Sequence, residues 1–232
     1  MNSNNTKTKS TQPATTRQGN GKYAGKAAST RQRERRAKLL SAGIKLIGSE
    51  GFAATSIDAV CSEAGLTKRY FYESFTNSEE LLIESYRAAT KELMNSILMA
   101  AAPYRDDSRK LVRVGLQQTF TFVQENPDKA QLIMIEAMSV RSQLGHVYGK
   151  SYNEFVDLLV AFTKPFLPDE GPGDTVLAVM ARGAVGAIIH LCQGWIATDF
   201  KQPADELVAG TEYIFGGMGR ELGISAWVNA PQ

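Results

Sequence analysis

Apolar side chains recur every three or four positions along most of this chain, which is the spacing that places them on one face of an α-helix. Segments with this spacing begin near residues 30, 55, 67, 77, 108, 126, 143, 174 and 203, and Gly, Pro or clusters of polar residues separate them. No segment shows a convincing strand pattern of alternating apolar and polar residues. The sequence therefore predicts an all-α protein of about nine helices.

The most informative stretch is residues 56–75, which has the pattern of two short helices joined by a tight turn. Gly65 supplies the left-handed backbone that such a turn needs, and Thr67 is a suitable N-cap for the second helix. Phe71 and Phe75 are four residues apart and point to one side, which leaves outward Lys68, Arg69, Tyr70 and Tyr72. This pattern predicts a helix-turn-helix, whose second helix enters the DNA major groove. A purely structural helical hairpin is the alternative.

The chain divides into three predicted parts. Residues 1–28 are rich in Ser, Thr, Asn, Gln and Gly and hold almost no large apolar side chains. We predict that they are disordered, because they cannot bury enough surface to offset the loss of chain entropy. Residues 29–77 form the predicted helix-turn-helix domain with three helices, and residues 78–232 form a larger helical bundle.

Charge is distributed unevenly between these parts. Residues 1–38 hold ten Lys and Arg against one Glu, a net charge of +9, whereas the whole chain carries only +2 and the remainder therefore −7. A basic end on an acidic body predicts a polyanionic partner at the basic end.

The composition offers little catalytic equipment. The chain has two His and two Cys, and it shows no metal-ligand, nucleophile-elbow or phosphate-loop motif. We therefore expect neither an enzyme nor a bound metal or cofactor, although an all-α enzyme that assembles Asp and Glu in space stays an alternative. Cys61 and Cys192 lie far apart without a C-x-x-C pair, and no secretory signal is visible, which together predict a cytoplasmic protein.

The apolar run at residues 176–197 is long enough to span a bilayer. Arg182, His190 and Gln193 interrupt it at intervals, so a buried helix of a bundle is the favoured interpretation.

Several short motifs resemble the DNA-binding domain of tetracycline-repressor (TetR) family regulators over about residues 33–87. They are Arg-Arg-Ala-Lys-Leu-Leu at 35–40, Gly-Phe at 51–52, Thr-Ser at 55–56, Ala-Gly-Leu-Thr at 64–67, Tyr-Phe-Tyr-Glu-Ser-Phe at 70–75 and Asn-Ser-Glu-Glu-Leu-Leu at 77–82. The resemblance implies a homodimeric transcriptional repressor that binds a palindromic operator and releases it when a small molecule binds.

The resemblance also assigns roles to single residues. It implies base reading by Lys68, Arg69, Tyr70, Tyr72 and Ser74, and phosphate contacts by Thr55 or Ser56, by Thr67 and by the amides around Ser78. The residue types agree, because Lys and Arg donate to guanine and Tyr packs on thymine methyl groups. Either tyrosine can instead pack in the core. The family often has Lys where Ser78 stands, which reduces that phosphate contact to a hydroxyl and a backbone amide.

The basic segment before the first helix adds a further expectation. The flexible segment before Arg31 and Arg33 can lie along the minor groove of the operator, and we expect these two arginines to contact DNA beside it. A solvated tail that only steers the protein by its charge is the alternative.

The last two predicted helices, about 174–198 and 203–223, are the expected dimer interface. The first is rich in small residues that allow close helix approach, and the resembled family dimerises through its last two helices. The fifth to eighth predicted helices would enclose a hydrophobic effector, with a wall formed by Phe120, Met134, Met138, Tyr152, Phe155 and His190. Each of these residues can instead be ordinary core.

One alternative function uses the same fold. Cys61 lies inside the helix-turn-helix, so its oxidation could control DNA binding and make the protein a redox-responsive regulator. A free cysteine among small residues usually belongs to the core instead.

Overall fold

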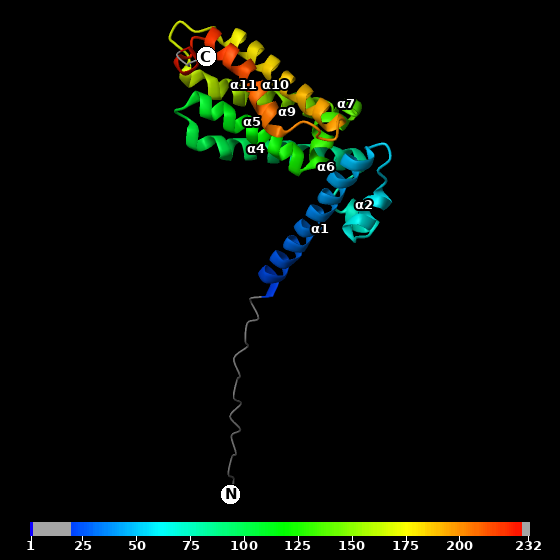
Figure 1. Cartoon of the computed structure of the whole chain (residues 1–232). Coiled ribbons are helices and arrows are strands. Elements are labelled where there is room, and N and C mark those ends of the chain that lie inside the picture. Colours follow the sequence, from blue (N-terminus) through cyan, green and yellow to red (C-terminus); the bar gives the residue numbers. More distant parts are fainter. Residues whose placement is uncertain (2–19, 229–232) are drawn as a thin grey trace.

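The computed structural model describes residue 1 and residues 20–228, and side chains from Ser29 onward. Helices and helical turns account for every regular element of this part (Figure 1). In order they are α1 (Asn20–Glu50), α2 (Ile57–Ala64), α3 (Lys68–Tyr72), α4 (Ser78–Ala101), the 3-10 turn η1 (Ala102–Tyr104), α5 (Ser108–Glu125), α6 (Pro127–Ala130), the π-helical turn η2 (Gln131–Glu136), α7 (Ala137–Ser139), α8 (Arg141–Leu144), α9 (His146–Thr163), the 3-10 turn η3 (Lys164–Phe166), α10 (Asp174–Ala197), α11 (Ala204–Glu221) and α12 (Ser225–Val228). The predicted all-α class is confirmed.

The predicted sixth and seventh helices are each interrupted. The sixth spans α6, η2 and α7, with a π-helical turn in the middle. The seventh comprises α8 and α9, because Gly145 between them has a positive φ of 54° and breaks the helix.

The first helix is longer than the sequence pattern indicates. We predicted a start near Thr30 after a disordered segment, but α1 begins at Asn20, so residues 20–28 are helical. Extending an existing helix requires no new nucleus, and the Ala and Lys residues of this stretch favour helix. The rest of the predicted disordered segment, residues 2–19, lies outside the described residues.

The N-terminal helices share a small core of their own. Leu39 of α1, Val60 of α2 and Phe71 of α3 are each at most 1% exposed and pack together with Phe75 and Leu81. The body that they form lies beside one end of the helical bundle, and α1 projects away from the bundle (Figure 1). The helix-turn-helix therefore sits at an exposed corner of the molecule.

The backbones of α1 and α6 touch where the small body meets the bundle. A Cβ atom added to Gly48 of α1 would clash with the backbone carbonyl of Asp128 in α6. Only glycine allows this approach, so α1 is seated directly on the bundle.

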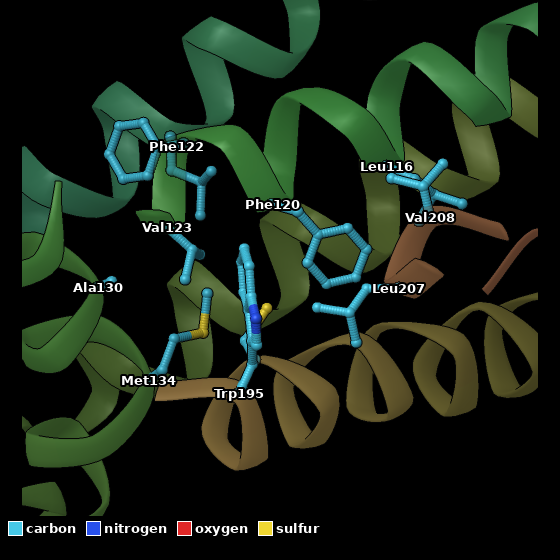
Figure 2. Close-up of a cluster of buried hydrophobic side chains, with 11 residues drawn as sticks. Leu116, Phe120, Phe122, Val123, Ala130, Met134, Trp195, Leu207 and Val208 are labelled. Carbon is cyan, nitrogen blue, oxygen red and sulfur yellow. The ribbon is translucent and has the colours of Figure 1, made fainter. Parts of the chain in front are cut away.

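The bundle has its own large core around Trp195 of α10 (Figure 2). The Trp195 ring meets Phe120 edge to face at 5.8 Å and Phe200 at 5.0 Å, and its indole N–H donates to the Gln202 carbonyl at 2.8 Å. Both the apolar surface and the polar atom of the largest core side chain are therefore satisfied.

Among the described helices, α10 alone is long and apolar enough to cross a membrane. Its most apolar window has a mean hydropathy of 1.8, and 28% of that window is buried within the chain. Its inner face packs in the bundle through Ala181, Cys192 and Trp195, whereas Val176 and Val179 are exposed on its outer face. We predicted that this helix is buried in a bundle. Within one chain, only its inner face is buried and its outer face is exposed.

Candidate nucleic-acid interface and ligand cavity

The turn between α2 and α3 has the geometry that its sequence indicates. The hydroxyl of Ser56 caps α2 by accepting the Ala59 N–H at 3.1 Å. Gly65 ends the helix in the left-handed conformation with φ 63° and ψ 36°. Thr67 then takes the extended N-cap position of α3, where its own hydroxyl makes no cap hydrogen bond. The exposed Thr67 hydroxyl is thus available at a helix N-terminus, where phosphates bind well.

The short helix α3 buries one face and exposes the other. Phe71 is fully buried in the core of the N-terminal body, and Tyr72 beside it is 58% exposed. The side chains of Lys68 and Arg69 are 57% and 83% exposed. We call Thr67, Lys68, Arg69 and Tyr72 the reading surface.

The cations of the reading surface are held by weak, exposed ion pairs. Lys68 Nζ lies 2.8 Å from Asp58 Oδ1, and this hydrogen bond raises the pKa of Lys68, so the side chain stays charged. Arg69 Nε lies 3.0 Å from Glu73 Oε1. Ion pairs of this exposure add little to stability, because water and salt screen them. DNA can therefore replace the acidic partners at little cost.

Two of the predicted base-reading residues have partners inside the protein. The half-buried Tyr70 ring lies under the Arg35 guanidinium, 4.4 Å from ring centroid to Cζ. The hydroxyl of Ser74 donates to the Tyr70 carbonyl at 2.9 Å, and Ser74 is also half-buried. They consequently support the reading surface more than they extend it.

The predicted phosphate contacts differ in what they can offer. The Thr55 hydroxyl donates to the Gly51 carbonyl at 2.8 Å, and the Ser56 hydroxyl already caps α2. Ser78 is the first residue of α4, whose N-cap Asn77 accepts the Glu80 N–H. Glu79 and Glu80 occupy the same first turn, and their negative charge weakens this helix terminus as a phosphate site.

The arginines of α1 fall into two groups. Arg31 and Arg33 are exposed on α1, as their position after the predicted helix start near Thr30 implies, and Arg33 Nε donates to the Ser29 carbonyl at 3.4 Å. Arg35 and Arg36 pack against the recognition region instead. Arg35 reaches Glu73 at 3.7 Å, and Arg36 pairs with Glu84 at 3.1 Å. Sequence reasoning noted these two charges but missed that they lock α1 onto α3 and α4.

A partly open cavity of about 130 Å³ lies in the bundle, lined by α4, α5, η2, α7, α9, α10 and α11. Four predicted ligand-binding residues line it, namely Met134, Met138, Tyr152 and Phe155. The other two do not. Phe120 is fully buried in the adjoining core, and His190 lies on the exposed side of α10. The helical period alone could not separate the cavity side of α5 and α10 from their other sides.

The cavity wall is almost entirely apolar. Its side chains include no Asp, Glu, Lys, Arg or His, and its polar groups are the hydroxyls of Tyr86, Thr119, Tyr148 and Tyr152. Tyr86 and Tyr148 were not predicted from the sequence. They stack with ring centroids 6.2 Å apart, a pairing that spacing within one helix could not reveal.

The π-helical turn η2 connects the cavity to the helix-turn-helix domain. Ile133 and Met134 of η2 line the cavity, and the Met134 carbonyl accepts the Gln193 side-chain N–H at 2.7 Å. Two residues further on, the Glu136 carboxylate accepts the Phe52 backbone N–H at 2.8 Å. Phe52 lies between α1 and α2. One short turn therefore touches both the cavity and the base of the helix-turn-helix.

Comparison with known proteins agrees with this architecture. The family model described as "Bacterial regulatory proteins, tetR family" matches residues 39–84. The HTH-type transcriptional regulator YdgC of Bacillus subtilis is 25% identical over 177 residues, which cover 74% of this chain and 86% of that protein. The HTH-type transcriptional activator FasR of Mycolicibacterium smegmatis is 22% identical over 186 residues, covering 80% and 83% respectively.

A solved structure shares the fold over most of the chain. The transcriptional regulator FadR from Bacillus subtilis, in complex with stearoyl-CoA, superposes with a TM-score of 0.60 at 15% identity and covers 82% of this chain and 98% of that one. The family-model match, the regulators among the relatives and the shared helical fold together identify this chain as a member of the TetR family of transcriptional regulators.

Proposed function

We propose that this protein is a dimeric repressor that binds a palindromic operator through α3 and releases it when an apolar effector enters the bundle cavity. The observation that carries the proposal is the combination, in one chain, of an exposed cationic and aromatic reading surface with an apolar cavity inside the bundle. Neither feature is needed for folding. Together they are the two sites that a ligand-controlled DNA-binding protein requires.

The reading surface supports sequence-specific binding. Arg69 and Lys68 supply donors for guanine, and Tyr72 offers a ring for thymine methyl groups and a hydroxyl for phosphates. Thr67 adds a free hydroxyl at the N-terminus of α3. Thr55, Ser56, Ser74 and Ser78 have lesser roles in this proposal, because their hydroxyls are used within the protein or lie beside acidic residues.

The outer face of α10 supports dimerisation. Val176 and Val179 of α10 and Tyr213 and Ile214 of α11 are each at least 45% exposed. Burying this apolar surface against the same surface of a second copy would form a two-fold four-helix interface. Such a dimer can place two α3 helices about 34–36 Å apart, the spacing of two half-sites on one face of DNA.

The apolar wall supports a hydrophobic effector, and the stearoyl-CoA complex of the FadR structure agrees with an effector that has a long apolar part. A ligand that displaces Ile133 or Met134 would shift η2 and, through Glu136, the base of the helix-turn-helix. That shift would change the spacing of the two α3 helices and weaken operator binding through linkage.

The redox alternative has less support. Cys61 is 5% exposed, and burial raises the pKa of its thiol, which disfavours the reactive thiolate. Cys192, the other cysteine, lies in the core of the bundle, where burial raises its pKa to about 12. A cytoplasmic location follows from the proposed role in transcription.

The test uses the purified full chain and the DNA that flanks its gene. We expect footprinting to show one protected palindrome, and a reporter under that promoter to rise when the gene is deleted. A fall in reporter output would make the protein an activator, as its relative FasR is named. Absence of any protected palindrome in the flanking DNA would contradict the proposed local operator.

A further inference from the structure

The hydroxyl of Tyr86 has no hydrogen-bond partner within the protein. Tyr86 is 3% exposed, lies on α4 and lines the cavity. The two other tyrosine hydroxyls of the wall are engaged, Tyr148 with Met138 Sδ at 3.2 Å and Tyr152 with the Arg182 carbonyl at 2.9 Å. In the described part of the chain, no donor or acceptor meets the Tyr86 hydroxyl.

An unmade hydrogen bond at a buried hydroxyl is costly, so such groups nearly always find a partner. The unpartnered polar side-chain atoms that are completely enclosed are the hydroxyls of Ser85 and Ser108, and Tyr86 is not among them. The Tyr86 hydroxyl therefore keeps some accessible surface, and the cavity that Tyr86 lines is the space next to it. Water or a ligand in the cavity is the partner that the hydroxyl can reach.

We propose that Tyr86 is the polar recognition residue of the effector site and donates its hydroxyl hydrogen to a neutral oxygen acceptor, such as a carbonyl, on an otherwise apolar ligand. This inference rests on the proposed function of the cavity as the effector site. It adds what that function leaves open, namely the chemistry of the ligand and the place of its polar atom.

The surroundings decide between a neutral and an anionic acceptor. Burial raises the pKa of Tyr86, and the nearby Tyr148 and the Glu154 carboxylate act in the same direction, so the phenol keeps its proton and donates. No cationic side chain lines the cavity. The nearest cations, Arg141 and Arg182, lie over the rings of Tyr148 and Tyr152 and are not part of the wall. A carboxylate or phosphate beside Tyr86 would lose water without a cation in the wall to compensate, which favours a neutral acceptor.

The shape of the wall sets the form of the ligand. On α4 the lining runs from Tyr86 to Ile97, eleven residues or about 16 Å of helix. A smaller cavity shares Leu111, Leu159 and Phe215 with the first and lengthens the apolar space. The ligand is therefore elongated, with its acceptor at the Tyr86 end.

That end is the one nearest the DNA-binding body. Tyr86 packs in one cluster with Ile47 of α1 and Leu132 of η2, and it lies only eight residues after the start of α4. A ligand oxygen bound to Tyr86 would shift α4 and the side chains of α1 that pack against Tyr86. Recognition of the polar atom and release of DNA are thereby coupled at one residue.

The test compares two probes of the same shape, 2-undecanone and 2-methyl-1-undecene, which differ in a carbonyl oxygen replaced by a methylene. Their affinities are measured by displacement of the fluorescent dye N-phenyl-1-naphthylamine from the full chain. We expect Tyr86→Phe to reduce the ketone-to-alkene affinity ratio about tenfold, the effect of one hydrogen bond. Tyr148→Phe and Tyr152→Phe are matched controls that should leave the ratio unchanged.

Because the Tyr86 hydroxyl has no internal bond, Tyr86→Phe should melt at the same temperature as the wild type or higher, which a thermal melt followed by circular dichroism verifies. An unchanged ratio in Tyr86→Phe, or an equal change in Tyr152→Phe, would overturn the assignment of Tyr86 alone. If neither probe displaces the dye from the wild type, the effector cavity itself is refuted, and this inference with it.

Discussion

Neighbouring residues of the recognition region differ sharply in what they can offer DNA. Arg69 is 83% exposed in its side chain and is held only by Glu73, whereas Tyr70 beside it lies half-buried under Arg35. The exposed residue can rotate toward a base edge with little loss. The half-buried one would have to leave its cation partner. Base reading should therefore depend on Arg69 more than on Tyr70.

We expect Arg69→Ala to weaken operator binding about 10- to 100-fold, because one lost base contact costs about 1–3 kcal/mol. Fluorescence anisotropy with the footprinted operator measures this. Arg105→Ala is the matched control, since Arg105 is exposed beyond the far end of α4, and its operator affinity should equal that of the wild type. Equal affinities for both variants would remove Arg69 from base reading.

The close contact between α1 and the bundle requires that residue 48 has no side chain. Gly48→Ala would push the α1 backbone from Asp128, and we expect a loss of about 1–3 kcal/mol in the free energy of unfolding, as in overpacked cores. Urea titration measures it. The control Gly149→Ala on α9 meets nothing within 4 Å and should be neutral or stabilising by up to about 1 kcal/mol.

At the scale of elements, the π-helical turn η2 contacts both the cavity and the base of the helix-turn-helix. A regular α-helix over residues 127–139 would turn its side chains and carbonyls in another direction. The wider π turn lets Met134 line the cavity while Glu136 reaches Phe52. π-Helical turns occur often at functional sites, and this one connects two of them.

Glu136 is far from the reading surface in sequence and packs at the base of the helix-turn-helix domain. We nevertheless expect Glu136→Ala to lower operator affinity about 2- to 30-fold, because mutations between two coupled sites change their coupling by about 0.5–2 kcal/mol. Hydrogen exchange at the Phe52 amide should quicken in the same variant. Glu125→Ala, at the exposed end of α5, is the control. Unaltered DNA binding together with faster exchange would show that the bond is structural only.

For the whole molecule, the central question is what covers the outer face of α10. A helix of this hydropathy with most of its apolar window unburied is stable in water only if a partner covers it. In the proposed dimer, a second copy covers this face and also pairs two reading surfaces. The basic first 38 residues and the acidic remainder then give the dimer two positive ends for DNA.

Val179→Glu should convert the dimer to a monomer, because it places charges against each other across a two-fold axis, and operator affinity should fall by at least tenfold with it. Light scattering after size-exclusion chromatography measures the mass. The control Met99→Glu changes an even more exposed apolar residue, on α4, and this variant should stay dimeric. A dimeric Val179→Glu protein would place the interface elsewhere.

Local signals in the sequence determined much of this protein. Gly65, the caps at Ser56 and Thr67, and the inward pair Phe71 and Phe75 specify the helix-turn-helix within twenty residues, because turns and caps depend on near neighbours. The family motifs could be recognised for the same reason.

Other features were decided by the tertiary structure alone. Tyr70 is half-buried because Arg35 of α1 lies over its ring, and Phe120 and His190 face away from the cavity because of how α5 and α10 are rotated in the bundle. The place of Tyr86 in the cavity wall and the bond from Glu136 to Phe52 depend on residues far apart in the chain. Helical periodicity shows that a side chain points inward, but only the packing of distant helices decides whether it meets a core, a cavity or a partner.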